Sequence, residues 1–143
     1  GSPALYAITP FNQRRGGKID VKCGYTMNIT SRIAKFEELF LWGVWYVAVI
    51  QVKYVPNAAQ MKHYENLLFA ELKKKGKIIE VPTRAKRQSE WFDIKTRDVH
   101  TAFAKVHKMI PKRHRGKLVR FEVETETKAE QDNIPYKKMF KHD

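Results

Sequence analysis

Five side chains in the first half of the chain carry the groups that hydrolysis of a phosphodiester bond requires. The carboxylate of Glu65 can hold one Mg²⁺ or Mn²⁺ ion, whose other ligands are water and phosphate oxygens. The planar guanidinium of Arg32 can bind a phosphate through two parallel hydrogen bonds. Tyr6 could deprotonate a water if its pKa, about 10 when unperturbed, were lowered by Lys22 or by the metal. Tyr25 and Lys22 are equal candidates for a share in the proton transfer.

Three of these residues also have ordinary structural interpretations. Tyr6 could be a core aromatic, and Lys22 could protect an edge strand from aggregation. Arg32 could be a solvated helix residue, but it lies four residues before Phe36, at the boundary of the predicted core. A charge at such a boundary needs a partner.

Glu65 has the clearest position of the five. It lies four residues after Met61 and three before Leu68, so it borders the apolar stripe of a predicted helix. A carboxylate there needs a cation, and we expect that cation to be the metal ion.

Hydrophobic periodicity predicts one domain in which strands and helices alternate. Asn28 or Thr30 is expected to cap the first helix, and Thr96 the third. Asn57, with Gln60 three residues on, is expected to cap the second. The expected strands cover residues 4–8, 18–26, 43–52, 90–94 and 118–123, and the expected helices end near residues 40, 75 and 110. These elements indicate an α/β fold of the α+β kind, with a small mixed, mainly antiparallel sheet flanked by about three helices.

The segments between these elements are polar. Residues 1–3 look like a vector-derived remnant, and residues 12–17 are typical of a turn or loop. Residues 77–90 are basic and irregular, and residues 124–143 form a polar tail. The domain itself is expected to cover residues 4–123.

Several short motifs occur in a recognisable order. Ala4-Leu5-Tyr6 and Lys22-Cys23-Gly24 stand on the first two strands, and the second triplet continues as Tyr-Thr-Met-Asn towards Arg32. Glu65 follows on a later helix, and Glu90-Trp91-Phe92 follows on a later strand. In this order the motifs resemble the GIY-YIG nuclease superfamily, in a branch common in phages and large DNA viruses. The resemblance covers about residues 4–108.

This resemblance implies a metal-dependent DNA endonuclease whose catalytic residues are Tyr6, Lys22, Tyr25, Arg32 and Glu65. It also implies that Glu65 is the metal ligand. The chain departs from the family pattern at Ala4, Lys22 and Cys23, although lysine also occurs at the second position in members that resemble active nucleases. The alternative is a nucleic-acid-binding module that kept the fold and lost catalysis.

The net charge of +13 favours a polyanionic partner. Residues 73–121 hold 16 basic and 4 acidic side chains, so this segment carries nearly all of the excess. We expect it to bind double-stranded or branched DNA, while an RNA- or ribosome-associated protein would have a similar composition. The residues expected to contact DNA are Lys73, Lys74, Lys75, Lys77, Arg84, Lys86, Arg87, Lys112, Arg113, Arg115 and Lys117.

Composition also excludes several classes of protein. No apolar stretch approaches the roughly 18 residues of a membrane span, so no membrane partner is expected. The single cysteine, Cys23, excludes a disulfide framework and a multi-cysteine zinc site. We therefore expect an intracellular protein, in cytoplasm or nucleus, and the resemblance implies that it is encoded by a phage or virus. A nuclease domain with one metal ion and one active site cuts one strand per encounter. A double-strand break would therefore need a homodimer, repositioning or a nicked partner strand.

Overall fold

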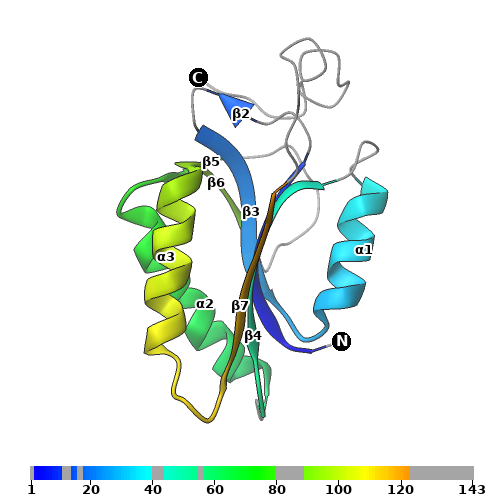
Figure 1. Cartoon of the computed structure of the whole chain (residues 1–143), viewed down its shortest axis with the longest axis vertical. Helices are drawn as coiled ribbons and strands as arrows, with labels where there is room; N and C mark the ends of the chain where they lie inside the picture. Colours follow the sequence, from blue (N-terminus) through cyan, green and yellow to red (C-terminus); the bar gives the residue numbers. More distant parts are fainter. Residues whose placement is uncertain are drawn as a thin grey trace.

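The computed structural model describes residues 2–10, 14–15, 18–39, 44–54, 57–79 and 89–122. Its helices and strands alternate along the chain and stack in layers (Figure 1). The strands are β1 (Ala4–Pro10), β2 (Arg14–Arg15), β3 (Lys18–Thr26), β4 (Val44–Val52), β5 (Lys77–Ile79), β6 (Ser89–Lys95) and β7 (Arg115–Glu122). The helices are α1 (Ile29–Leu39), α2 (Ala58–Lys73) and α3 (Thr96–Met109).

The strands form one sheet in the order β5-β6-β3-β1-β4-β7, with β2 beside β3. Every strand pair in the described part of the chain is antiparallel, so the sheet is not mixed. The predicted α+β architecture, a mainly antiparallel sheet with three helices, is confirmed.

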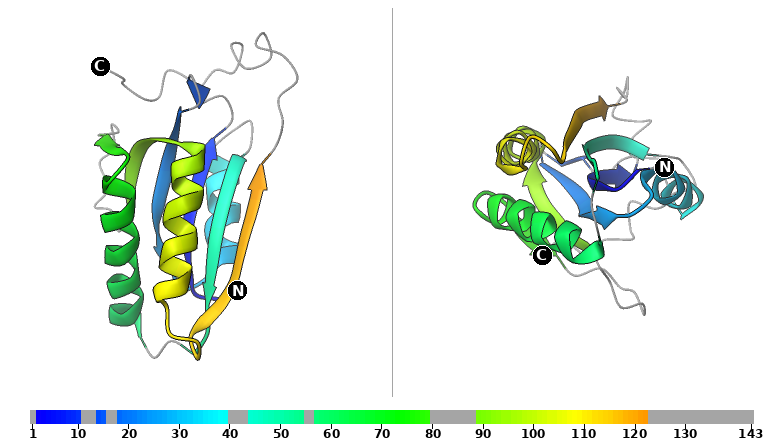
Figure 2. Two further views of the ribbon diagram at one scale, coloured as in Figure 1. Left: turned by 60° about the vertical axis from the view of Figure 1, so that its left-hand side comes forward. Right: turned by 90° about the horizontal axis from the view of Figure 1, so that it is seen from below.

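Helices cover both faces of the sheet, with α2 and α3 on one face and α1 on the other (Figure 2). Because side chains alternate along a strand, neighbouring residues of β1 enter different layers. Leu5 and Ala7 pack beneath α2 and α3, whereas Tyr6 and Ile8 lie on the α1 side. Both layers are apolar, and the larger one lies beneath α2 and α3.

Strand β3 follows the predicted alternation. Ile19, Val21 and Cys23 are fully buried in the layer beneath α2 and α3, which leaves Lys22 on the α1 side. The interpretation of Lys22 as an edge-strand guard is wrong, because β3 lies between β6 and β1 inside the sheet.

Two of the three helix starts follow the sequence expectation. Asn28 caps α1, where its Oδ1 accepts the N–H of Ser31, and Asn57 caps α2 by accepting the N–H of Gln60, both at 3.1 Å. Thr96 does not cap α3. It is the first helical residue, and Lys95 stands at the cap position without a side-chain bond, because β6 runs directly into the helix.

The short strands β2 and β5 lie in segments that are expected from sequence to be irregular. They contain two and three residues, which is too short to show an alternation of apolar and polar residues. Their pairing with β3 and β6 is what makes them strands. Strand β7 begins at Arg115, three residues earlier than expected, because Gly116 lies tightly against β4. A Cβ on Gly116 would come within 2.3 Å of the Gln51 carbonyl oxygen.

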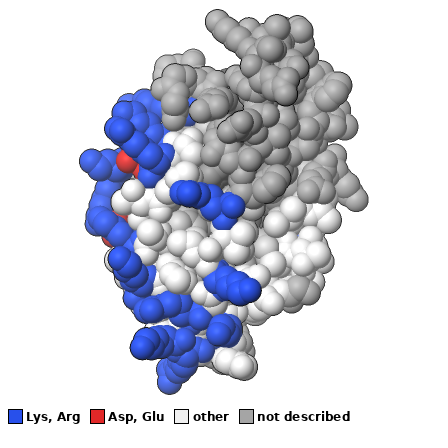
Figure 3. All heavy atoms as spheres, in the orientation of Figure 1, with Lys and Arg blue, Asp and Glu red and all other residues white. Residues whose placement is uncertain are grey.

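On the face shown in Figure 3, the basic side chains of the described residues are unevenly distributed. Lys and Arg side chains gather along the side on which α2 and α3 lie (Figure 3). The predicted polar tail, residues 124–143, and the basic residues Arg84, Lys86 and Arg87 lie outside the described part of the chain.

Candidate functional site

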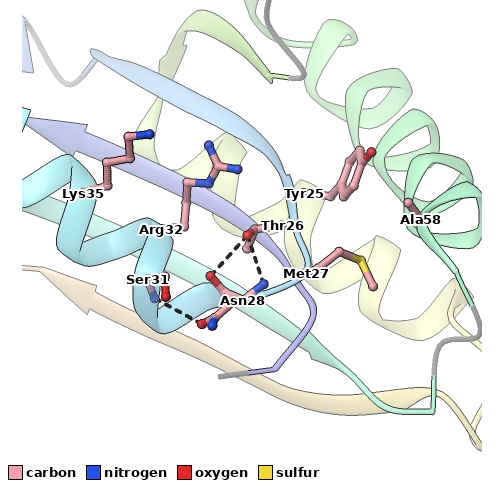
Figure 4. Close-up of a pocket in the computed structure, with 8 residues that line it drawn as sticks. All are labelled: Tyr25, Thr26, Met27, Asn28, Ser31, Arg32, Lys35 and Ala58. Carbon is pink, nitrogen blue, oxygen red and sulfur yellow. Dashed lines mark hydrogen bonds between the residues drawn. The ribbon is translucent and has the colours of Figure 1, made fainter.

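A pocket of about 420 Å³ opens where β3 ends and α1 begins. The side chains of Arg32 and Lys35 reach it from α1, and Tyr25 points from the end of β3 towards α2 (Figure 4). The lining residues are Tyr25, Thr26, Met27, Asn28, Ser31, Arg32, Lys35 and Ala58. The pocket therefore lies between the first turn of α1 and the first residue of α2.

The turn between β3 and α1 is held by its own hydrogen bonds. The Oγ1 of Thr26 accepts the N–H of Asn28 at 3.1 Å and donates to the carbonyl of Asn28 at 3.2 Å. The N–H of Ile29 donates to the carbonyl of Ser2 at 3.0 Å. No acidic residue stands in the first turn of α1, so the positive end of the helix dipole and the cations Arg32 and Lys35 favour an anion in the pocket.

Glu65 lies on α2 with no exposed surface. Its Oε2 accepts the backbone N–H of Tyr25 at 3.1 Å, and its Oε1 accepts a hydrogen bond from the Lys62 ammonium at 2.6 Å. Burial raises the pKa of Glu65 above its ordinary value, although Lys62 and the Tyr25 N–H act in the opposite direction. The prediction that this carboxylate needs a cation is met within the chain by Lys62.

Sequence reasoning missed Lys62, although a signal for it was present. Lys62 precedes Glu65 by three residues, the spacing at which side chains meet on a helix surface. The hydrogen bond to Glu65 raises the pKa of Lys62, so the ammonium keeps its proton at neutral pH. About half of the Lys62 side chain, 53%, is exposed, so it can leave Glu65 without disturbing the core.

Tyr6 and Lys22 lie on the α1 face of the sheet. Tyr6 is 2% exposed, and its ring centroid lies 5.7 Å from that of Phe36 on α1. The Lys22 ammonium lies 5.3 Å from the Phe36 ring centroid and 5.8 Å from that of Trp91, a cation–π arrangement. Phe36 is one helical turn after Arg32, so Tyr6 and Lys22 support the helix that carries Arg32.

The structure thus divides the five predicted catalytic residues between the two faces of the sheet. Tyr6 and Lys22 lie with Phe36 beneath α1, while Glu65 lies on α2 against the opposite face. Arg32 and Tyr25 line the same pocket, and the backbone of Tyr25 links that pocket to Glu65. Tyr25 therefore connects the pocket that Arg32 lines with the carboxylate of Glu65.

A hard divalent ion could reach the Glu65 carboxylate only after Lys62 had left Oε1. Within the described residues, no three histidine, cysteine or acidic side chains are grouped as a metal site. A single carboxylate suffices for Mg²⁺ or Mn²⁺ when waters and substrate phosphates supply the remaining ligands. The Tyr25 N–H would stay on Oε2 and hold the carboxylate in place.

Comparison with known families decides what kind of domain this is. The T5orf172 domain matches residues 4–107, which is most of the chain and includes every predicted catalytic residue. The chain belongs to the T5orf172 domain family. This is a phage-associated domain of the nuclease class, which agrees with the resemblance found in the sequence motifs. No curated protein and no solved structure gives a significant match.

Ala4 stands where the GIY-YIG pattern that the motifs resemble has its first glycine. In this T5orf172 domain Ala4 is fully buried within the apolar layer on the α1 side. In the described part of the domain, no helix is long and apolar enough to cross a membrane.

The described basic residues near the end of α2 and after α3 form two groups at opposite ends of the sheet. Lys73 is the last residue of α2, and Lys74, Lys75 and Lys77 follow it. The group from Lys112 to Lys117 follows α3. Helix α2 is 16 residues long, so about 24 Å separates its two ends. The end of α3 lies at the same end of the sheet as the starts of α1 and α2 (Figure 1). The 112–117 group is therefore the one that lies towards the pocket.

Arg115 differs from the other predicted DNA-binding residues in this group. Its Nε donates to the carbonyl of Ile110 at 3.1 Å, and its Nη2 donates to the carbonyl of Lys108 at 2.9 Å. These bonds satisfy carbonyls at the end of α3 and fix the following turn. Lys112, Arg113 and Lys117 are exposed and better suited to bind phosphate.

Proposed function

We propose that this domain is a divalent-metal-dependent DNA endonuclease of the GIY-YIG type. The observation that carries the proposal is the link between the pocket and Glu65. Arg32 lines a cationic pocket at the start of α1, and Tyr25 of the same pocket binds the buried carboxylate through its backbone. A phosphate clamp and a carboxylate are the two parts that phosphodiester hydrolysis needs most.

Arg32 is the proposed phosphate clamp. Its guanidinium donates two parallel hydrogen bonds to a phosphate seated at the positive end of α1, where Lys35 adds a second charge. Phe36 of α1 packs against Tyr6, and the Lys22 ammonium lies over the Phe36 ring. These contacts hold α1 in place against the sheet. In this role Tyr6 and Lys22 are positioning residues for Arg32.

Glu65 is the proposed ligand of one Mg²⁺ or Mn²⁺. The ion, when bound, would relieve charge on the phosphate and lower the pKa of a water molecule. Lys62 leaves Oε1 for this binding, while the Tyr25 N–H keeps Oε2 oriented.

Tyr25 is the better placed of the candidates for proton transfer. Its ring lines the pocket, whereas the Tyr6 ring is 2% exposed and lies on the α1 face. The family pattern gives water activation to Tyr6, and that role would require water to reach it beneath α1. Separate Phe substitutions at Tyr6 and Tyr25 distinguish these assignments.

A DNA-binding module without catalysis is the second candidate. This candidate is favoured because both carboxylate oxygens of Glu65 already accept hydrogen bonds from the chain itself. Such a module would use the cationic surface and would not need the carboxylate.

Nicking of supercoiled plasmid separates the two functions. Wild-type protein is expected to produce open circles with Mg²⁺ or Mn²⁺ and none with EDTA. Glu65→Gln keeps the acceptor for the Tyr25 N–H and is expected to abolish nicking while DNA retardation persists. Metal-independent nicking, or equal nicking by the variant, would contradict the endonuclease proposal. Retardation without any nicking would identify the binding module.

A further inference from the structure

Tyr54 is the most solvent-exposed of the large hydrophobic side chains that the structure describes. It is 84% exposed, compared with 47% for Met109 and Val119. It follows the end of β4 by two residues. A ring exposed to this degree contributes little to packing within the domain.

The backbone of Tyr54 is held in an unusual conformation. Its φ of 54° is the one positive value at a non-glycine residue in the described part of the chain. Bulky residues rarely adopt such a φ, and local strain of this kind is concentrated at functional sites. Asparagine or glycine would satisfy the same turn at lower cost.

The residue before Tyr54 is tied to the turn that follows α3. The N–H of Lys53 donates to the carbonyl of His114 at 2.8 Å, and the His114 Nδ1 lies 2.7 Å from the carbonyl oxygen of Lys53. Gly116 permits this turn to lie directly against β4. Tyr54 is thus presented from a fixed base rather than from a free loop.

Basic residues share a pocket with Tyr54. Tyr54 lines a pocket of about 550 Å³ together with Lys53, Arg115 and Lys117. Exposed aromatic rings bordered by lysine and arginine are typical of surfaces that stack on bases while the cations bind the phosphates. A protein partner would have to match the same cations with carboxylates, and the net charge of +13 makes nucleic acid the better match.

Tyr54 also lies at the same end of the sheet as the proposed phosphate clamp. The carbonyl of Pro3 accepts the N–H of Val52 at 3.0 Å, and the carbonyl of Ser2 accepts the N–H of Ile29 at 3.0 Å. The segment Ser2–Pro3 therefore joins the end of β4 to the start of α1. DNA bound at Arg32 would pass close to Tyr54.

We propose that Tyr54 stacks on an unpaired base of the DNA substrate. This rests on the proposed function and adds a substrate class, because a ring can stack on a base only where the duplex is open. Bulged, nicked or branched DNA is therefore the preferred substrate. Lys53 and Lys117 bind the flanking phosphates.

Binding measured with EDTA tests this without requiring cutting. Fluorescence anisotropy would compare a plain duplex with the same duplex carrying one unpaired thymine. Wild type is expected to bind the bulged duplex about tenfold more tightly, the lower range for removal of one stacked base. Tyr54→Asn, which tolerates the positive φ, is expected to lose this preference, and Tyr54→Trp to keep it. Ile78→Thr, an exposed apolar residue at the other end of α2, is the control and should also keep it.

A second readout locates the interaction directly. Replacing the unpaired thymine with 5-iodouracil and irradiating the complex should cross-link the base to Tyr54, as mapped by mass spectrometry. An unchanged preference in Tyr54→Asn, or equal binding of both duplexes by wild type, would overturn the stacking proposal alone. Absence of binding to either duplex would overturn the proposed function with it.

Discussion

The Lys62 ammonium lies 2.6 Å from Oε1 of Glu65, so a half-exposed lysine neutralises a carboxylate that has no exposed surface. The two residues are three apart on α2, and both lie within the residues that the T5orf172 domain matches. A carboxylate buried in this way is costly unless it is paired. Lys62 reduces that cost while the domain is free of metal, and its exposed stem allows it to leave.

Removing Lys62 should make metal binding easier. In Lys62→Gln the ion no longer competes with an ammonium, so the Mg²⁺ concentration for half-maximal nicking should fall by about two- to fivefold. Lys105→Gln is the matched control, because Lys105 is another half-exposed lysine that pairs with a glutamate, Glu71. An unchanged metal requirement in Lys62→Gln would contradict the competition.

Replacing Glu65 should change how stability depends on pH. Burial raises the pKa of Glu65 above its ordinary 4.5, so the folded chain binds this proton more tightly than the unfolded chain. The stabilisation from that proton is complete below pH 4.5 and is lost as pH rises through the raised pKa. Metal-free Glu65→Gln should therefore gain stability relative to wild type between pH 4.5 and neutrality.

Urea unfolding at several pH values without metal measures this difference. A difference that stays constant with pH, or one that favours wild type increasingly as pH rises, would be inconsistent with a raised pKa at Glu65. A variant that is more stable at neutral pH and yet inactive would show that the carboxylate is retained for function.

Arg32 should be sensitive even to a change that keeps its charge. Lysine lacks the planar pair of donors, so Arg32→Lys should slow nicking about a hundredfold while DNA affinity in EDTA changes less than about threefold. Arg97→Lys is the same change on an exposed residue of α3 and should cut normally. Nicking by Arg32→Lys at the wild-type rate would remove Arg32 from the phosphate site.

The two described basic groups should contribute unequally to DNA binding. Replacing Lys112, Arg113 and Lys117 with glutamine should make DNA affinity less dependent on salt. The slope of log affinity against log salt concentration should become shallower by about 0.9 for each phosphate that the variant no longer neutralises. Neutralising Lys73, Lys74 and Lys75 removes the same charge at the far end of α2 and should have a smaller effect. Equal slopes in the two triple variants would mean that DNA extends over both ends.

The long elements of this fold are predictable from sequence because each has its own pattern. The apolar positions of α2 and the alternation of Ile19, Val21 and Cys23 identify a helix and a strand without reference to the rest of the chain. Strands β2 and β5 were not predictable, because pairing with a neighbour defines them. The cap of α3 was misassigned because β6 leads into that helix without a connecting turn.

The sequence motifs indicated which residues to consider for the candidate site, but they did not indicate how those residues are arranged in space. Flanking by Met61 and Leu68 predicted that Glu65 borders the apolar stripe, and the structure buries Glu65 completely. The separation of Tyr6 from Glu65 depends on which face of the sheet each helix covers, and local periodicity carries no information on that choice. Lys62 was within reach of a simple helical-spacing argument, since it precedes Glu65 by one turn.

Direct measurement of Mn²⁺ binding tests whether Glu65 holds the catalytic metal ion. Titration of Mn²⁺ into the protein with DNA bound, at a temperature where cutting is slow, can be followed by the electron paramagnetic resonance signal of the free ion. We expect the complex of wild-type protein with DNA to bind one more Mn²⁺ per chain than the complex of Glu65→Gln with the same DNA, at the same concentrations. Equal Mn²⁺ binding by wild type and Glu65→Gln would contradict this expectation.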